Sequence, residues 1–111
     1  MALNGRYLAD ADRLREAGDY SQASEKYWGA TAEIIKAIAE KRGWDHSSHR
    51  DIRTALRRLA QETGDEDMRR LFSIMESLHA NFYENWMDAE DLRIHAEDAH
   101  LLIEKLTPLA A

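Results

Sequence analysis

The segment 77–86, SLHANFYENW, holds side chains that can bind a ligand. His79 and Tyr83 lie one helical turn apart, and an imidazole and a phenol can together hold a base or a phosphate. Inside a helical bundle they can equally hydrogen-bond to each other or to a backbone group. We expect Asn81 to point away from the apolar stripe of this segment. Without an arginine nearby, His79 is a poor candidate for a nuclease residue.

A glycine in the middle of a predicted helix marks a second candidate region. Gly29, in YWGAT, costs about 1 kcal/mol relative to alanine at such a position. It falls on the polar side of the helix, with Glu25, Glu33 and Lys36. A glycine there is useful where a partner helix, a backbone or a ligand comes close. We therefore expect Gly29 at an interface, bordered by Glu25 and Lys36.

Arginines form the main basic feature. Arg50, Arg53 and Arg57 share one flank of a predicted helix, and Arg69 and Arg70 follow on the next. Such a stripe can follow a phosphate backbone, or it can be a solvated face that pairs with acidic neighbours. Because no exposed aromatic residues are interleaved with it, we expect no sequence-specific reading of RNA, and nothing signals DNA specificity.

Metal sites are weakly indicated. Two Glu-x-x-His pairs match part of the di-iron sites of helical bundles. Glu97, however, falls opposite the predicted buried face of its helix, which argues against a metal site in the core. His46 and His49 provide only half of a surface site. We therefore expect no metal and no cofactor.

The composition is that of a folded protein, with 44% hydrophobic and 32% charged residues. A length of 111 residues fits one domain, 1–111, with a modest core. The net charge of −6 argues against binding of nucleic acid by the whole surface. No cysteine, signal-peptide pattern or membrane-spanning apolar run occurs, so we expect a cytoplasmic protein without a membrane partner.

Helical periodicity runs along almost the whole chain. It predicts five helices: Leu3–Glu16, Tyr20–Arg42, one capped by Ser48 and Asp51 and ended by Gly64, one capped by Asp65 with a stripe reaching Trp86, and one from Asp88 to just before Pro108. Gly43 is expected in a left-handed C-cap. Short loops between long helices imply antiparallel neighbours, so the predicted fold is an all-α, up-and-down bundle.

Three separated motifs resemble the archaeal PaREP family. They are GDYSQASEKYWGATAEIIKAIAEKRGW, the histidine that opens the next helix (His49), and LHANFYE. The first is also similar to half of a tetratricopeptide repeat, but nothing recurs about 34 residues away. PaREP proteins in turn resemble the HEPN superfamily of small helical bundles, which often dimerise. The resemblance implies a bundle and says little about activity.

The resemblance to HEPN proteins gives Arg93 and His100 a candidate catalytic role. Many HEPN ribonucleases place an arginine and a histidine a few residues apart at a dimer interface, where they act on the ribose hydroxyl and the phosphate. Arg93 and His100 have six residues between them. Ile94 and Leu101 stand where that pattern has a polar residue and a tyrosine. A metal-independent endoribonuclease is therefore one alternative function.

The last predicted helix is apolar on two sides. Met87, Ile94 and Leu101 recur every seven residues, opposite Leu92 and Ala99. A surface helix of a monomer seldom has two apolar sides, so we expect a homodimer interface there. A C-terminal tail that folds back is the other explanation.

The favoured function is a dimeric binding or regulatory module that acts with nucleotide or RNA. Besides the ribonuclease, a second alternative is a protein–protein interaction module whose partner covers the apolar face of the last helix.

Overall fold

Five α-helices make up the fold in the computed structural model, which describes residues 2–111 and the side chains from residue 5 onward. They are α1 (Ala2–Glu16), α2 (Tyr20–Arg42), α3 (His49–Thr63), α4 (Asp67–Glu84) and α5 (Ala89–Leu106), and a short 3₁₀ turn, η1 (Thr107–Ala110), follows α5. The described residues contain no strand. The predicted all-α bundle of five helices is confirmed.

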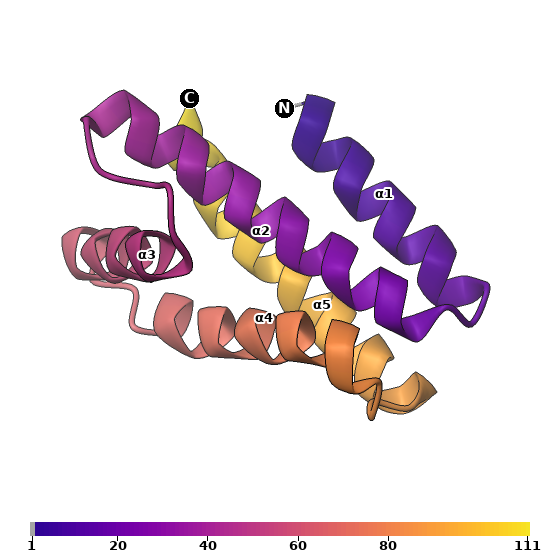
Figure 1. Cartoon of the computed structure of the whole chain (residues 1–111). Coiled ribbons are helices and arrows are strands. Elements are labelled where there is room, and N and C mark those ends of the chain that lie inside the picture. Colours follow the sequence, from indigo (N-terminus) through magenta and orange to yellow (C-terminus); the bar gives the residue numbers. More distant parts are fainter. Residues whose placement is uncertain (1) are drawn as a thin grey trace.

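Helix α2 lies at the centre of the bundle. It packs against every other helix and against η1, and its Tyr27, Ile34, Ile35 and Ile38 are fully buried. In Figure 1, α1 runs along α2 on one side and α4 and α5 lie on the other, whereas α3 is seen nearly end-on and crosses the ends of its neighbours. The wide apolar arc of α2 explains this position, because it must meet helices on several sides.

Local capping residues set the helix ends as predicted. Gly43 and Gly64 adopt left-handed backbone angles, with φ of 71° and 70°. Ser48 and Asp51 form a reciprocal capping box at the start of α3. Helix α4 differs slightly, because its N-cap residue is Glu66 rather than Asp65.

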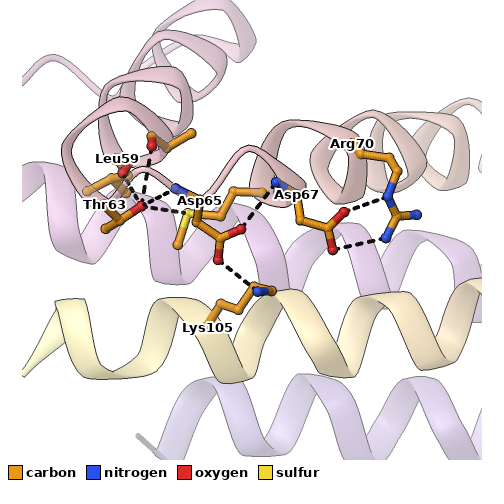
Figure 2. A network of polar contacts seen from close by, with 8 residues as sticks. Leu59, Thr63, Asp65, Asp67, Arg70 and Lys105 are labelled. Atoms are coloured by element: carbon orange, nitrogen blue, oxygen red, sulfur yellow. Dashed lines mark hydrogen bonds and ion pairs between the residues drawn. The ribbon is translucent and has the colours of Figure 1, made fainter.

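Asp65 nevertheless holds the turn between α3 and α4 in place. Its carboxylate accepts a hydrogen bond from the Asp67 backbone N–H at 3.1 Å and one from Lys105 Nζ, on α5, at 2.7 Å. Figure 2 shows this network, together with the paired hydrogen bonds from Arg70 to Asp67. The bond from Arg70 lowers the pKa of Asp67, and the bond to Asp65 raises the pKa of Lys105. The network ties the start of α4 to the far end of the chain.

The loop between α4 and α5 corrects two predictions. Asn81 is fully buried rather than pointing outward, and its Oδ1 accepts hydrogen bonds from the backbone N–H groups of Trp86 and Met87 at 2.8 and 2.9 Å. Asn85 ends α4 with a left-handed φ of 51°. The apolar stripe of α4 therefore stops before Trp86, which is 56% exposed.

The same loop changes the predicted dimer face. The seven-residue repeat predicts Met87 beside Ile94 and Leu101, but Met87 is only 4% exposed, because it precedes α5 and turns into the core. Ile94 and Leu101 remain 43% and 39% exposed. The η1 turn folds back onto α2 and α5, but it leaves both Ile94 and Leu101 exposed. No helix among the described residues combines the length and apolar character that crossing a membrane requires.

Candidate functional site

A shallow pocket of about 280 Å³ lies between α3 and α4. It is lined by Arg53, Leu56, Arg57, Arg69, Phe72, Ser73 and Glu76. Leu56 and Phe72 are buried, with 1% and 3% exposure, so they form an apolar base beneath the charged groups. The pocket therefore joins three guanidinium groups and one carboxylate above a rigid base.

The arrangement of α3 and α4 brings the three arginines together. Arg53 and Arg57 are four residues apart, which places them on one face of α3. Arg69 comes from the first turns of α4, directly after the tight connection that starts at Gly64. The arginine stripe predicted on α3 is thus extended by one residue of the neighbouring helix.

The charges of this pocket are unequal. Arg53 donates to Glu76 Oε2 from Nε at 2.9 Å and from its terminal nitrogen at 2.6 Å. Within residues 5–111, no carboxylate forms an ion pair with Arg57 or Arg69. Two guanidinium groups therefore keep their full charge available, which makes this a positive region on a chain of net charge −6.

Next to the pocket, an indole and two imidazoles form a cluster in which the rings of His49 and His79 also meet edge-on, 5.8 Å apart. The ring of Trp28 is 4.8 Å from that of His49 and 4.9 Å from that of His79, centroid to centroid. Tyr83 follows, with its ring 5.9 Å from His79 in an edge-on arrangement. Trp28 is 8% exposed whereas Tyr83 is 72% exposed. The aromatic run therefore starts between helices and ends at the open surface.

A carboxylate fixes each imidazole. His79 Nδ1 lies 2.9 Å from Glu25 Oε1, and His49 Nε2 lies 2.8 Å from Glu76 Oε2. An ionised carboxylate only accepts hydrogen bonds, so each of these ring nitrogens carries the hydrogen.

Three of the four candidate ligand-binding residues predicted from the sequence lie together in the structure, namely Glu25, His79 and Tyr83. Lys36 does not join them, because it pairs with Glu33 on its own helix at 3.7 Å.

Glu76 connects the arginine pocket to the aromatic run, since it accepts hydrogen bonds from both Arg53 and His49. We call the whole feature the α4 strip. It comprises Arg53, Arg57, Arg69, Glu76, His49, Trp28, His79 and Tyr83. Its members on α4 recur at intervals of three, four and seven residues, so they share one face of that helix. Sequence reasoning found its pieces separately but could not join them.

The candidate catalytic residues Arg93 and His100 have separate partners. Arg93 is exposed and donates to Glu90 at 3.3 Å and to Glu97 at 3.0 Å. The bond with Glu90 raises the pKa of Arg93 and lowers that of Glu90. His100 Nε2 instead lies 3.0 Å from Asp12 Oδ2, on α1. The α3–α4 pocket is lined by neither of them.

His100 belongs to a network that sequence reasoning missed. The buried hydroxyl of Tyr27 donates to Asp12 and accepts a hydrogen bond from Arg15 Nε at 3.3 Å. Burial, followed by the hydrogen bond to Asp12, raises the pKa of Tyr27. Asp12 and His100 are 88 positions apart, so no local pattern could reveal the contact. The network links α1 to both α2 and α5.

The histidines near the start of α3 do not converge on a metal. His46 faces Glu40 at 2.5 Å, whereas His49 faces Glu76. Across the part of the chain that the structure describes, no three histidine, aspartate or glutamate side chains are grouped in a way that could hold a metal ion.

Comparisons with known proteins identify a similar fold and the family of this chain. A search of curated sequences gives no significant match. A crystal structure of a Sulfolobus solfataricus protein is similar, with a TM-score of 0.84 and 20% identity over 97% of this chain and 96% of that one. At this identity the similarity shows the fold alone. The model of the Archaeal PaREP1/PaREP8 family matches residues 1–103. Because that match spans almost the whole sequence, the chain belongs to the archaeal PaREP1/PaREP8 family.

Proposed function

We propose that this protein is a binding module that holds the phosphate groups of a nucleotide or RNA between α3 and α4. One observation carries the proposal: Arg53, Arg57 and Arg69 line a single pocket in which Glu76 is the only carboxylate of the lining. Guanidinium groups are well suited to phosphate because their planar N–H groups can bind two of its oxygens at once.

The surroundings of the pocket support this proposal. Arg57 and Arg69 have no carboxylate partner within residues 5–111, so binding a phosphate would not require an existing ion pair to break at either residue. Glu76 is occupied by Arg53 and His49, which reduces its repulsion of an anion. On a chain of net charge −6, such a localised basic site attracts phosphate, while the rest of the surface does not bind anions non-specifically.

The proposal includes a homodimer. Ile94 and Leu101 stay exposed on α5 although large apolar side chains are usually buried. Apart from its chain neighbours and the nearby backbone of its own helix, Gly29 has no described heavy atom within 4 Å of the position where a Cβ would lie, so space for a partner exists there. A second copy can cover an exposed patch with the same patch of its own.

The test is RNA binding measured by fluorescence anisotropy over a range of salt concentrations. We expect the wild type to bind and Arg57→Glu to bind at least about tenfold more weakly, with a smaller dependence on salt. Arg6→Glu is the matched control, because Arg6 is exposed on α1 and makes the same change in net charge. Equal losses in both variants, or no binding by the wild type, would overturn the proposal.

A further inference from the structure

We infer that the ligand of the α4 strip is an extended single strand of nucleic acid, with phosphates at the arginine pocket and a base stacked on Tyr83. This inference rests on the proposed function and narrows its ligand to one class. The observation behind it is the continuity of the strip: Glu76 joins the arginine pocket to the aromatic run, and Tyr83 ends that run in solvent.

The length of the strip excludes a mononucleotide as its full occupant. Tyr83 follows Glu76 by seven residues and Arg69 by fourteen on one continuous helix. At 1.5 Å per residue these separations are about 10 and about 21 Å. Successive nucleotides of a stacked strand are about 3.4 Å apart. A ligand that reaches both ends must therefore contain several nucleotides.

The ring of Tyr83 is positioned for stacking. It is 72% exposed, yet its orientation is held by edge-on contacts with Phe82 at 4.8 Å and with His79 at 5.9 Å. His79 is in turn held by Trp28 and Glu25. A tyrosine that is exposed and already oriented loses little conformational freedom when a base stacks on it. Such stacking tolerates any base.

These features favour a single strand over a duplex. In a duplex the base faces are covered by neighbouring bases, so Tyr83 could gain nothing from them, whereas the bases of a single strand can stack on an aromatic side chain. The groups of the strip that face solvent are guanidiniums, imidazoles and a phenol, which can bind phosphates and base faces in RNA and DNA alike. We therefore expect recognition of single-stranded character rather than of sequence.

The experiment compares a mononucleotide, a dinucleotide, a tetranucleotide and an octanucleotide, as RNA and as DNA, with a duplex of the octanucleotide sequence. Each is titrated into wild type, Tyr83→Ala, Tyr83→Phe and Arg57→Glu. We expect affinity to rise with strand length and the single strand to bind better than the duplex. Tyr83→Ala should weaken octanucleotide binding about tenfold without changing its salt dependence, whereas Tyr83→Phe should retain wild-type affinity. Preference for RNA over DNA would show that the 2′-hydroxyl is also read, and equal binding would assign recognition to the shared chemistry.

The inference and the proposed function fail in different ways. If Arg57→Glu weakens binding while Tyr83→Ala does not, or if the duplex binds as well as the single strand, the strip inference is overturned and the arginine pocket stands. If none of the nucleic acids binds to the wild type, both are overturned.

Discussion

Asn81 Nδ2 donates a hydrogen bond to Ser24 Oγ at 2.9 Å, and both side chains are fully buried. The Ser24 hydroxyl in turn donates a hydrogen bond to the Tyr20 carbonyl oxygen at 2.7 Å. Because Asn81 also accepts the N–H groups of Trp86 and Met87, one amide links α2, α4 and the loop that leads to α5. The side-chain amide of Asn81 therefore makes all but one of the hydrogen bonds that it can form.

Replacing this amide should destabilise the protein. We expect Asn81→Ala to lower the free energy of unfolding by about 3 kcal/mol, since it leaves buried donors without acceptors. Urea denaturation measures the loss. Asn85→Gly, in the same loop, is the control and should change stability by at most about 0.5 kcal/mol, because glycine readily adopts the left-handed backbone of that position. Equal stabilities for the two variants would contradict this role of Asn81.

Association should depend on the apolar residues left on α5. We expect wild-type protein to be a dimer by light scattering, and Leu101→Glu and Ile94→Glu to be monomers with unchanged helix content. Gln61→Glu, exposed on α3, adds the same charge elsewhere and should remain dimeric. Gly29→Leu should keep the helix content of the wild type and block association, because the space beside the Cβ position of Gly29 is open toward other parts of the chain. If Leu101→Glu, Ile94→Glu and Gly29→Leu all remained dimeric, the proposed interface would be wrong.

Single-stranded RNA should remain intact in the presence of the protein. Arg93 is engaged by Glu90 and Glu97, and His100 by Asp12, so a substrate would have to displace an existing partner from each candidate catalytic group. Labelled RNA incubated with excess chelator, beside a His100→Ala variant, tests this expectation. Cleavage by the wild type that the variant lacks would restore the endoribonuclease hypothesis.

Tyr27 should make stability fall at alkaline pH. Its pKa is raised by burial and by its hydrogen bond to Asp12, so the folded chain keeps a proton that the unfolded chain releases above about pH 10. This contribution is complete below that pH and is lost above it, at up to about 1.4 kcal/mol per pH unit. Urea denaturation between about pH 8 and about pH 11 should show a steeper loss for wild type than for Tyr27→Phe. Parallel curves would mean that the phenol of Tyr27 does not govern alkaline stability.

Local signals made the helices predictable. The serine and aspartate of the α3 capping box are three residues apart, and Gly43 and Gly64 each act on the helix that they end. The wrong predictions concern the loop between α4 and α5. The predicted stripe of α4 extends past its end at Asn85 to Trp86, and the predicted repeat of α5 extends back past its N-cap, Asp88, to Met87. The left-handed turn at Asn85 moves Met87 from the expected outer face into the core.

The candidate site was only partly predictable because most of its contacts connect distant parts of the chain. His79 and Tyr83 share one helical turn and could be paired from sequence alone. The contact of Arg53 with Glu76 spans 23 positions, and that of His79 with Glu25 spans 54. Such contacts depend on how α3 crosses α4 and how α2 packs beside both, which helical periodicity does not specify.

The open space beside Gly29 gives the chain a convenient covalent reporter. The sequence contains no cysteine, so Gly29→Cys would introduce a single thiol at a position where its Cβ clashes with nothing within 4 Å. Two such thiols can form a disulfide only when their Cβ atoms come within about 4 Å of each other. Oxidative cross-linking would therefore occur if a two-fold axis passed close to this point, and the covalent product would preserve the arrangement of the two copies for inspection under denaturing conditions.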